Sequence, residues 1–510
     1  MSLAVAQRKT PGGVLAVDLA ATANLVGTLI LYLSPAALLP AALAIGYRER
    51  FWSYLVAAAV AAAFGFALTR LTADAAPIGV REGYLVVAMT WLLVAVYGSI
   101  PYLLSGEEQL DRPVDALFES MAGFTTTGSS VLTDVESLDR SLLLWRAETQ
   151  WLGGMGIIVL VLAVLPRLRV GGRQLFESEM PGPEVESLGA RIRQTAQRLW
   201  ILYVGITVLE ALVLAVLGWT GVDERMDLFR AVAHAFTTVP TGGFSTEALS
   251  IAAFSTATQW VVAFFILVGG TNFALTYRAL LRRDPRLFAR DEEFRLYIGL
   301  LMLAAAVLTV ELWAEGVLRG EAAIRTAVFQ TLTILTGTGY SSANFDAWPV
   351  LAVILIVGLM FIGGSAGSTS GSVKVIRHLM MGKILRRELR QTVHPELVEP
   401  IRFNGTPVDE RTLRAIASFV LMYIGLFIAG ALLIAFDAAR TDLELRPLDI
   451  VAVSASAVGN VGPALGIAGP HGNYEAFSDA SSLVLVLLMW IGRLELLPVL
   501  VLLTRSYWRR

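Results

Sequence analysis

Four short glycine-rich runs carry backbone that could bind an ion. They read TTTGSS (125–130), VPTGGFS (239–245), TGTGYSS (336–342) and GNVGPAL (459–465). Each run follows an apolar piece of 11 or 12 residues, which is too short to cross a bilayer as a helix. Glycine permits backbone angles that aim carbonyls in one direction, and carbonyls can replace the hydration shell of a cation. The runs therefore predict a cation site built from backbone oxygens.

The runs recur in step with a second glycine marker. Aligned on Gly128, Gly243, Gly339 and Gly462, the runs are separated by 115, 96 and 123 residues, which indicates an internal repeat. Each run is followed by a second marker, whose first glycine stands 24 to 30 residues after the loop glycine; the markers are WLGGMG (151–156), LVGGTN (267–272), FIGGSA (361–366) and WIGRLE (490–495). Two markers in step through the chain predict four units of helix, half-helix, glycine loop and helix.

The composition is that of a membrane protein. Of 510 residues, 55% are hydrophobic and 16% are charged, whereas soluble proteins have roughly 25% charged residues. The mean hydropathy is +0.65. The net charge of -2 gives no reason to expect a nucleic-acid partner. The chain has no cysteine, which excludes disulfides and thiolate metal sites.

Ten apolar stretches are long enough to span a bilayer core, which needs about 20 residues of helix. They lie at 19–46, 52–70, 83–104, 143–166, 197–219, 257–281, 294–314, 348–376, 415–436 and 482–504. The short apolar pieces at 113–124, 226–236, 322–332 and 447–458 are expected to be re-entrant half-helices that enter from outside.

The predicted fold is an all-α polytopic membrane protein. It has four pseudo-symmetric helix–pore-helix–helix units around one central pore, plus two extra N-terminal transmembrane helices. The predicted boundaries are 1–78 for the N-terminal pair, then 79–172, 173–285, 286–390 and 391–510 for the four units.

The positions of Lys and Arg predict the orientation. Basic segments follow the outgoing helices at 167–174, 277–290, 374–390 and 505–510, and positive charge marks cytoplasmic loops. We therefore expect a multi-pass protein of the cytoplasmic (inner) membrane with both termini in the cytoplasm. Arg48 and Arg50, between the first two spans, fit this orientation less well.

The sequence resembles the Trk, Ktr and HKT superfamily of potassium transporters, and in particular its Trk-type membrane subunit. The resemblance covers nearly the whole chain and rests on AGFTTTGSS, QWLGGMGI, HAFTTVPTGGFST, TGTGYSSANF, GGSAGSTSGSVKVIRH, NVGPALG and GRLELLPVL. It implies that the four loops form a potassium filter in one chain. Some HKT members have serine at the first filter position and favour sodium. Because this chain has Gly128, the resemblance implies potassium, with sodium as an alternative cation.

The resemblance assigns the filter residue by residue. The filter residues are Thr126, Thr127, Gly128, Thr241, Gly242, Gly243, Thr338, Gly339, Tyr340, Val461, Gly462 and Pro463. Potassium is expected at the carbonyls of Thr127, Gly128, Gly242, Gly243, Thr338, Gly339, Val461 and Gly462. No organic cofactor is expected in this chain.

Residues 363–372, GGSAGSTSGS, contain four Gly and four Ser in the middle of a predicted span. This composition cannot hold a stable helix, so a flexible obstruction beside the pore is expected, and the resemblance implies a gate there. The alternative is a helix kink at small residues that aids packing. A phosphate-binding loop is not supported, because the Gly-Lys-Ser/Thr ending and a preceding strand are missing. The predicted gating residues are Gly363, Gly364, Gly367, Gly371, Lys374 and Arg493.

Arg493 takes the place at which the other markers have Gly154, Gly270 and Gly364. A charge in the hydrocarbon layer usually faces a cavity or a partner. The resemblance implies that this arginine lies near the permeation path and limits ion passage. A buried ion pair with Glu148, Glu210 or Glu311 is the alternative, and the sequence leaves both open.

Several polar residues near the loops also have two interpretations. Glu119 and Glu148 could attract cations or hold a half-helix in place. Asn272, Asn344 and Asn460 could assist ions, but backbone hydrogen bonding is favoured for them.

Partners follow from the resemblance and from loop length. No cytoplasmic segment much exceeds 35 residues, which is too short for a nucleotide-binding domain. The resemblance implies a homodimer in membrane lipid that binds a cytosolic Trk-type nucleotide-binding regulatory subunit. A polytopic enzyme acting on a lipid-linked substrate is the alternative function, although such an enzyme has no need for four glycine loops. Channel-like flux and symport with H⁺ or Na⁺ are not separated by the sequence.

Overall fold

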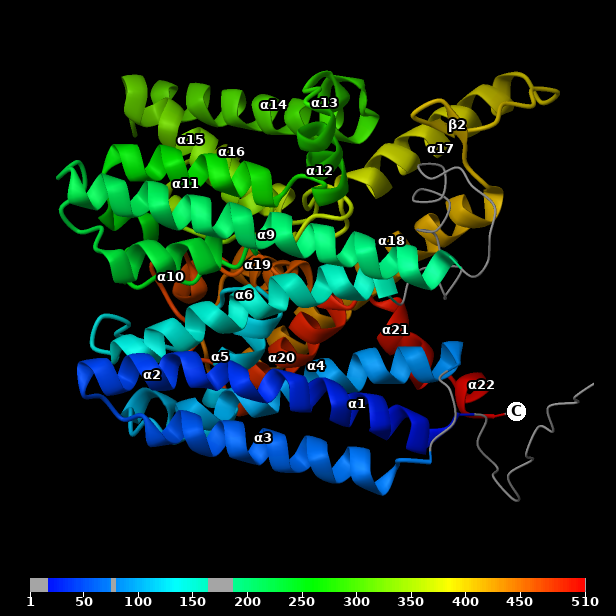
Figure 1. The fold of residues 1–510 in the computed structure, drawn as a ribbon. Helices are drawn as coiled ribbons and strands as arrows, with labels where there is room; N and C mark the ends of the chain where they lie inside the picture. Colours follow the sequence, from blue (N-terminus) through cyan, green and yellow to red (C-terminus); the bar gives the residue numbers. More distant parts are fainter. Residues whose placement is uncertain (1–16, 75–78, 164–186, 510) are drawn as a thin grey trace, which may run out of the picture.

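The protein is an array of helices that run roughly side by side (Figure 1). The structure is a computed structural model that describes residues 17–74, 79–163 and 187–509. The helices of the first half are α1 (Leu19–Leu33), α2 (Leu38–Tyr47), α3 (Trp52–Leu71), α4 (Val80–Leu103), α5 (Pro113–Phe124), α6 (Arg140–Ala163), α9 (Ser187–Trp219), α10 (Leu228–Thr238), α11 (Thr256–Gly269), α12 (Phe273–Arg282) and α13 (Arg286–Arg290). Those of the second half are α14 (Glu292–Ala314), α15 (Gly320–Leu335), α16 (Val350–Leu359), α17 (Val375–Val393), α18 (Glu410–Arg440), α19 (Pro447–Gly459), α20 (Asp479–Arg493), α21 (Leu497–Leu500) and α22 (Arg505–Trp508). A small antiparallel hairpin, β1 (Arg402–Phe403) with β2 (Thr406–Pro407), precedes α18.

Six of the predicted spans are confirmed as long apolar helices. Within the described residues these are Leu19–Tyr47, Trp52–Leu71, Arg81–Leu103, Gln194–Trp219, Glu292–Ala314 and Glu410–Arg440. The predicted span 143–166 matches α6, although its last three residues lie outside the described part of the chain. The basic segment 167–174 and the N-terminal residues 1–16 also lie outside it, so their expected cytoplasmic position stays a prediction.

Two outgoing helices that we predicted as continuous are broken, and in this respect the sequence prediction was wrong. The predicted span 257–281 is a pair, α11 and α12, bent by 98°, and 482–504 is a pair, α20 and Leu497–Leu503, bent by 111°. The predicted span 348–376 ends as a helix at Leu359 and resumes at Val375, which confirms the interruption expected at 363–372.

The breaks follow the glycine markers and have local causes. The Asn272 side chain accepts hydrogen bonds from the backbone N–H groups of Ala274 and Leu275 and so starts a new helix in a new direction. This confirms the backbone role favoured for that asparagine. After α20, Glu495 and Leu496 have φ of 56° and 60°, outside the right-handed helical region. Apolar composition carries no sign of either turn.

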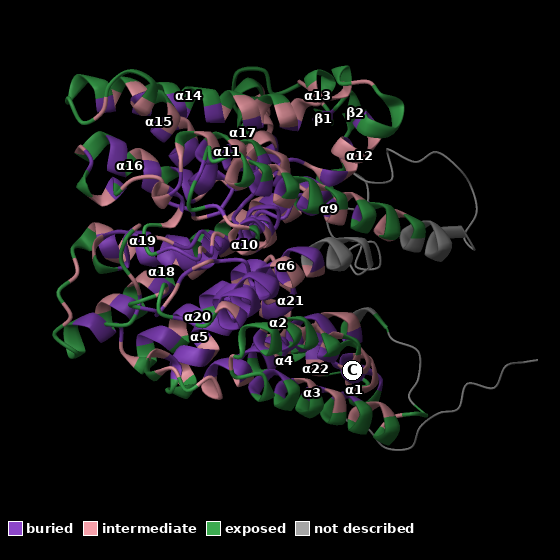
Figure 2. Cartoon of the chain, turned by 60° about the vertical axis from the view of Figure 1, so that its left-hand side comes forward, coloured by how far each residue is buried: buried purple, intermediate pink, exposed green. Residues whose placement is uncertain are grey.

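Four short helices, largely buried, lie at the positions predicted for the half-helices. They are α5, α10, α15 and α19, and Figure 2 shows their surroundings as the most buried part of the chain. Local residues account for three of the starts, because Pro113 and Pro447 each occupy the first turn, and Asp227 caps α10 by accepting a hydrogen bond from the Arg230 N–H. The third half-helix is 16 residues long and thus exceeds the predicted 322–332.

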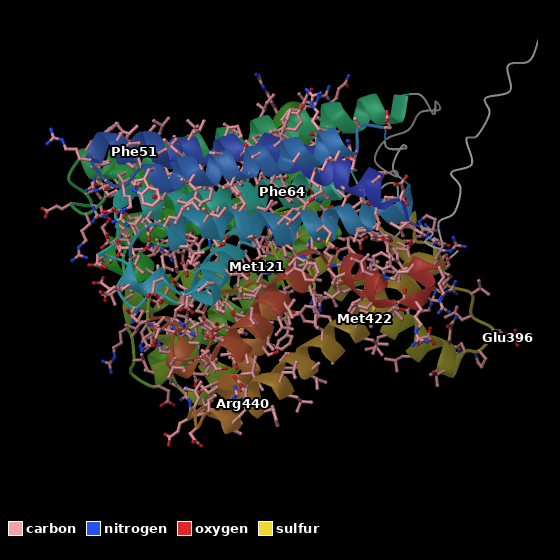
Figure 3. All side chains as sticks on the ribbon, turned by 90° about the horizontal axis from the view of Figure 1, so that it is seen from below. Phe51, Phe64, Met121, Glu396, Met422 and Arg440 are labelled. Carbon is pink, nitrogen blue, oxygen red and sulfur yellow. The ribbon has the colours of Figure 1, made fainter. Side chains whose placement is uncertain are left out.

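The outer helices expose apolar side chains and the inner ones bury them. Phe51 and Phe64 of the N-terminal region are 42% exposed, whereas Met121 of α5 is fully buried (Figure 3). α17 lies at the same end of the array as α22 (Figure 1), and Arg440 lies at the opposite end from Glu396 (Figure 3). The cytoplasmic orientation expected for α17 and α22 stays a prediction.

Candidate ion-binding site

The four loop glycines, Gly128, Gly243, Gly339 and Gly462, share one backbone conformation. Their φ angles are +80°, +80°, +82° and +106°. The residues two positions earlier also have positive φ, namely Thr126, Thr241, Gly337 and Asn460 at 51°, 54°, 71° and 53°. Non-glycine residues rarely adopt this region, so the same unusual alternation in four places reflects one repeated loop.

The loop amides bond back to the half-helices. The residue before each loop glycine donates its N–H to a carbonyl five residues earlier, with lengths of 2.9, 2.8, 2.8 and 2.9 Å for Thr127, Gly242, Thr338 and Val461. In the first three loops the loop glycine donates to the same carbonyl. Because N–H and C=O point in opposite directions across a trans peptide, the carbonyls of Thr127, Gly242 and Thr338 point away from their half-helices.

These carbonyls meet the neighbouring loop in a closed cycle. A Cβ atom placed on Gly128 would lie 2.1 Å from the Gly242 oxygen, and one on Gly243 would lie 2.0 Å from the Thr338 oxygen. A Cβ atom on Gly339 would lie 2.0 Å from the Val461 oxygen, and one on Gly462 would lie 2.6 Å from the Thr127 oxygen. Each loop thus touches the next, and the fourth touches the first. The chain brings four backbone oxygens, one from each loop, into one ring.

Two predicted ligands have side-chain donors on their carbonyls. The Gly462 oxygen accepts hydrogen bonds from the hydroxyls of Ser129, Ser456 and Tyr474, each at 2.9 Å. The Gly242 oxygen accepts one from Gln150 Nε2 at 2.6 Å. A carbonyl has two lone pairs, so Gly462 has the least capacity left for a cation among the predicted ligands.

Several other predicted filter side chains bond within the protein, whereas the buried hydroxyl of Thr126 has no hydrogen-bond partner. The hydroxyl of Thr127 lies 2.7 Å from that of Thr125, and the hydroxyl of Thr338 lies 2.7 Å from that of Thr336. The Tyr340 hydroxyl lies 2.5 Å from Thr237 Oγ1, so its ring packs toward the second half-helix. Pro463 lies beside the third loop, with its Cδ 2.9 Å from the Cβ position of Gly339.

The second marker packs beneath the loops. A Cβ atom on Gly153 would lie 2.0 Å from the Phe124 oxygen, and one on Gly492 would lie 2.0 Å from the Val458 oxygen. Both carbonyls stand four residues before their loop glycine. In the second unit, Gly269 faces the corresponding Val239 oxygen at 2.8 Å. Close approach of helix and loop explains why the two markers keep step along the sequence.

In the third unit the segment between α16 and α17, residues 360–374, takes this place, and we call it the crossing segment. Its buried Thr369 bonds to the second unit, with Oγ1 donating to the Val239 and Gly269 oxygens at 3.1 Å each. Ser365 donates its N–H to the Gly270 oxygen at 2.9 Å. The crossing segment is therefore held in place by backbone of the second unit.

The crossing segment itself needs its glycines. Gly363 and Gly367 have φ of +81° and +72°, and a Cβ on Gly371 would lie 2.4 Å from the Gly459 oxygen. Gly364 lies against the Gly270 oxygen, with its Cβ position 2.8 Å away. A side chain at Gly364 or Gly371 would collide with the backbone of another unit, and one at Gly363 would collide with Gly371 of the same segment.

Arg493 is buried and bonds to backbone oxygens. Its Nη1 donates to the Thr369 oxygen at 2.8 Å, and its Nη2 donates to the Gly153 oxygen at 3.3 Å. In the part of the chain that the structure describes, it forms no ion pair with a carboxylate. Of the three suggested partners, Glu210 has no hydrogen-bond partner on either oxygen, and Glu148 has none on Oε2.

Sequence reasoning missed an ion-pair cluster at the end of the crossing segment. Glu495 accepts from Lys374 Nζ and from Arg377 Nη2, each at 2.5 Å. The two bases are three residues apart, one just before α17 and one in its first turn, and this short spacing was the available signal. The cluster joins the start of α17 to the break after α20.

Glu119 and Asn460 bond within the protein. Glu119 is fully buried and pairs with Arg146 at 2.7 Å, while its oxygens also accept the Ser130 hydroxyl. Asn460 Nδ2 donates to Thr127 Oγ1 and to the Met489 oxygen, both at 2.9 Å. Glu119 therefore holds its half-helix to its own loop, and Asn460 joins the fourth loop to the first.

Comparison with known proteins covers nearly the whole chain. The model of the TrkH family, described as cation transport protein, matches residues 53–509. The Trk system potassium uptake protein TrkH of Escherichia coli K12 is 35% identical over 497 residues, which are 96% of this chain and 99% of that protein. The TrkH protein of Halomonas elongata is 36% identical over 432 residues, covering 84% of this chain and 86% of the relative. The crystal structure of the potassium transporter TrkH from Vibrio parahaemolyticus superimposes with a TM-score of 0.84 at 31% identity, covering 97% of this chain and all of that one.

Proposed function

Since the chain belongs to the TrkH family of cation transport proteins, we propose that it takes up potassium ions across the cytoplasmic membrane. Relatives that match 96% and 84% of the chain are named potassium uptake proteins. The family consists of transporters, so the membrane-enzyme alternative is set aside.

The closed ring of carbonyls is the observation that carries the proposal. The oxygens of Thr127, Gly242, Thr338 and Val461 would form one layer of ligands, with those of Gly128, Gly243 and Gly339 in an adjacent layer. Gly462 would contribute less, because three hydroxyls occupy its oxygen. In this proposal four pseudo-symmetric units surround one pore, and the helices before α4 form the extra N-terminal pair.

We assign the crossing segment as the gate. Its Thr369 bonds to the base of the second loop at Val239 and to Arg493, so it lies directly beneath the proposed filter. Gly363, Gly364, Gly367 and Gly371 permit its close packing in the closed arrangement. Lys374 ties the segment through Glu495 to the last unit.

Control from the cytoplasm would reach the gate through α17. This helix follows the crossing segment directly and extends to the end of the molecule where α22 lies (Figure 1). A cytosolic Trk-type nucleotide-binding subunit that binds α17 could shift the gate between arrangements. We propose a homodimer of this chain as the partner of that subunit, with both termini in the cytoplasm.

The test is ion flux with purified protein in liposomes. An inside-negative potential drives K⁺ inward by about 2.3 kcal/mol per 100 mV, so tracer potassium uptake above that of protein-free liposomes is expected. Sodium tracer measured in parallel gives the selectivity, and a pH gradient imposed in the absence of a potential tests coupling to protons. A folded protein with no potassium uptake, alone or with its cytosolic subunit, would contradict the proposal.

A further inference from the structure

One face of α6 carries two buried polar side chains that bind the second glycine loop. Gln150 Nε2 donates to the Gly242 oxygen at 2.6 Å, and Gln150 Oε1 accepts from the Phe244 N–H at 3.1 Å. Arg146, one turn earlier, donates from Nη1 to the Ser245 oxygen at 3.2 Å, and its guanidinium lies 4.1 Å from the Phe244 ring centroid. Residues four apart share a helix face. The single helix α6 therefore holds the loop on both sides of Gly243, at Gly242 before it and at Phe244 and Ser245 after it.

Arg146 also binds the first loop. Its Nε donates to Glu119 Oε1 at 2.7 Å, and its Nη2 donates to Ser130 Oγ at 3.3 Å. Glu119 in turn accepts the Val131 N–H at 3.2 Å. The guanidinium therefore links the outer limbs of two neighbouring loops. Both members of the ion pair are almost completely buried, so neither can be lost without leaving an unpaired charge.

The other three outgoing helices have no such pair. Gln150 stands three residues before the first glycine of its marker, and the residues at this position in the other three helices are Ile266, Met360 and Met489. The place of Arg146 is taken by Val262, Ile356 and Leu485. All six side chains are apolar, so this clamp exists only between the first and second loops. The polar pair is thus not a requirement of the repeated fold.

We propose that Gln150 and Arg146 are positioning residues that set the preference of the filter for potassium over sodium. The proposal rests on the function proposed above. Gly242 carries one of the ring oxygens, and a donor at 2.6 Å fixes the direction of that carbonyl. A fixed ring keeps the spacing suited to the larger ion, whereas a carbonyl freed from Gln150 can move inward around a smaller one.

The test replaces Gln150 by the residue that the third and fourth units have at the same place. Gln150→Met keeps the side-chain volume and removes both hydrogen bonds to the second loop. A buried hydrogen bond of this kind contributes about 1 kcal/mol, so we expect the potassium-to-sodium flux ratio in liposomes to fall about three- to tenfold. Met489→Leu, at the same place in α20, is the matched control and should leave the ratio unchanged.

Two further variants keep the proposal testable if Gln150→Met does not fold. Gln150→Asn retains the amide but withdraws it by one methylene, and Arg146→Lys retains the charge beside Glu119 but loses the planar fork that reaches Ser245. Each should lower the flux ratio while total potassium flux persists. A folded Gln150 variant with the wild-type flux ratio would overturn this inference but leave the proposed function intact. Wild-type protein without potassium flux would instead remove the function on which the inference rests.

Discussion

Placing a single side chain on the first loop glycine gives the sharpest test of the proposed filter. Gly128 has φ of +80°, and a Cβ atom there would lie 2.1 Å from the Gly242 oxygen. Because real Cβ contacts begin at 3.0 Å, the Gly128→Ser substitution must separate the two groups by about 1 Å. The displaced atom is a carbonyl oxygen of the proposed ring, so the change acts on ion coordination directly.

The free-energy cost can be worked out from the same contacts. A non-glycine residue in this region of φ costs about 1–2 kcal/mol. Moving the Gly242 carbonyl by about 1 Å also lengthens its 2.6 Å hydrogen bond from Gln150 beyond bonding distance, which costs about 1 kcal/mol. The sum of about 2–3 kcal/mol is tolerable for a folded protein of this size. If the same free energy separates the binding of potassium from that of sodium, the ratio of the two affinities changes by a factor of at least about ten.

We therefore expect Gly128→Ser to fold and to lower the potassium-to-sodium flux ratio at least about tenfold. The assay is paired tracer uptake of the two ions into liposomes, with folding checked by thermal unfolding and by elution as a single species. Gly299→Ser is the control, since Gly299 lies in α14 with no atom within 4 Å of its Cβ position. A well-folded Gly128→Ser protein with the wild-type ratio would refute the assignment of the loop as a filter.

Three other predictions concern the gate. Deleting residues 365–371 should give high potassium flux that no longer depends on the cytosolic subunit, measured as tracer uptake with and without it; a folded deletion that still requires the subunit argues against a gate here. Arg493→Ala removes the hydrogen bond to the Thr369 oxygen and should raise flux with selectivity unchanged, so unaltered flux in liposomes counts against its place in the pore. Glu495→Gln weakens both ion pairs to the start of α17 and should raise flux in the absence of the subunit, whereas the exposed Glu396→Gln should not; equal flux in the two variants would show that the ion pairs are not part of the gate.

The features that the sequence predicted are those that need glycine or a particular cap. A loop with positive φ at Gly128 admits few other residues, and the same restriction operates in all four loops. Helix starts likewise depend on local chemistry: Pro113 and Asp227 stand at the starts of two half-helices, which begin within two residues of the predicted ranges. Such requirements are satisfied within a few residues and therefore leave a pattern in the sequence.

The features that the sequence did not predict depend on distant backbone. The 98° bend after Gly269 changes the direction of a helix without changing its apolar composition. The partners of Arg493 are the carbonyls of Thr369 and Gly153, and a backbone carbonyl has no side-chain identity by which it could be found. Glu495 and Lys374 are 121 residues apart, so their pairing required the packed structure.

If the crossing segment is the gate proposed above, the contacts of Thr369 set the scale of the free energy that a regulator must supply. Its N–H and hydroxyl both bond to the Gly269 oxygen, its hydroxyl also reaches Val239, and its carbonyl accepts from Arg493. If three of its groups lose their partners when the segment moves, at about 1 kcal/mol each, the closed arrangement is favoured by about 3 kcal/mol at this residue. A ligand shifts such an equilibrium only through its difference in affinity for the two states. A partner that opens the proposed gate must therefore bind the open arrangement at least about 150-fold more tightly than the closed one. The cytosolic subunit that we propose to bind α17 would have to supply this difference in affinity.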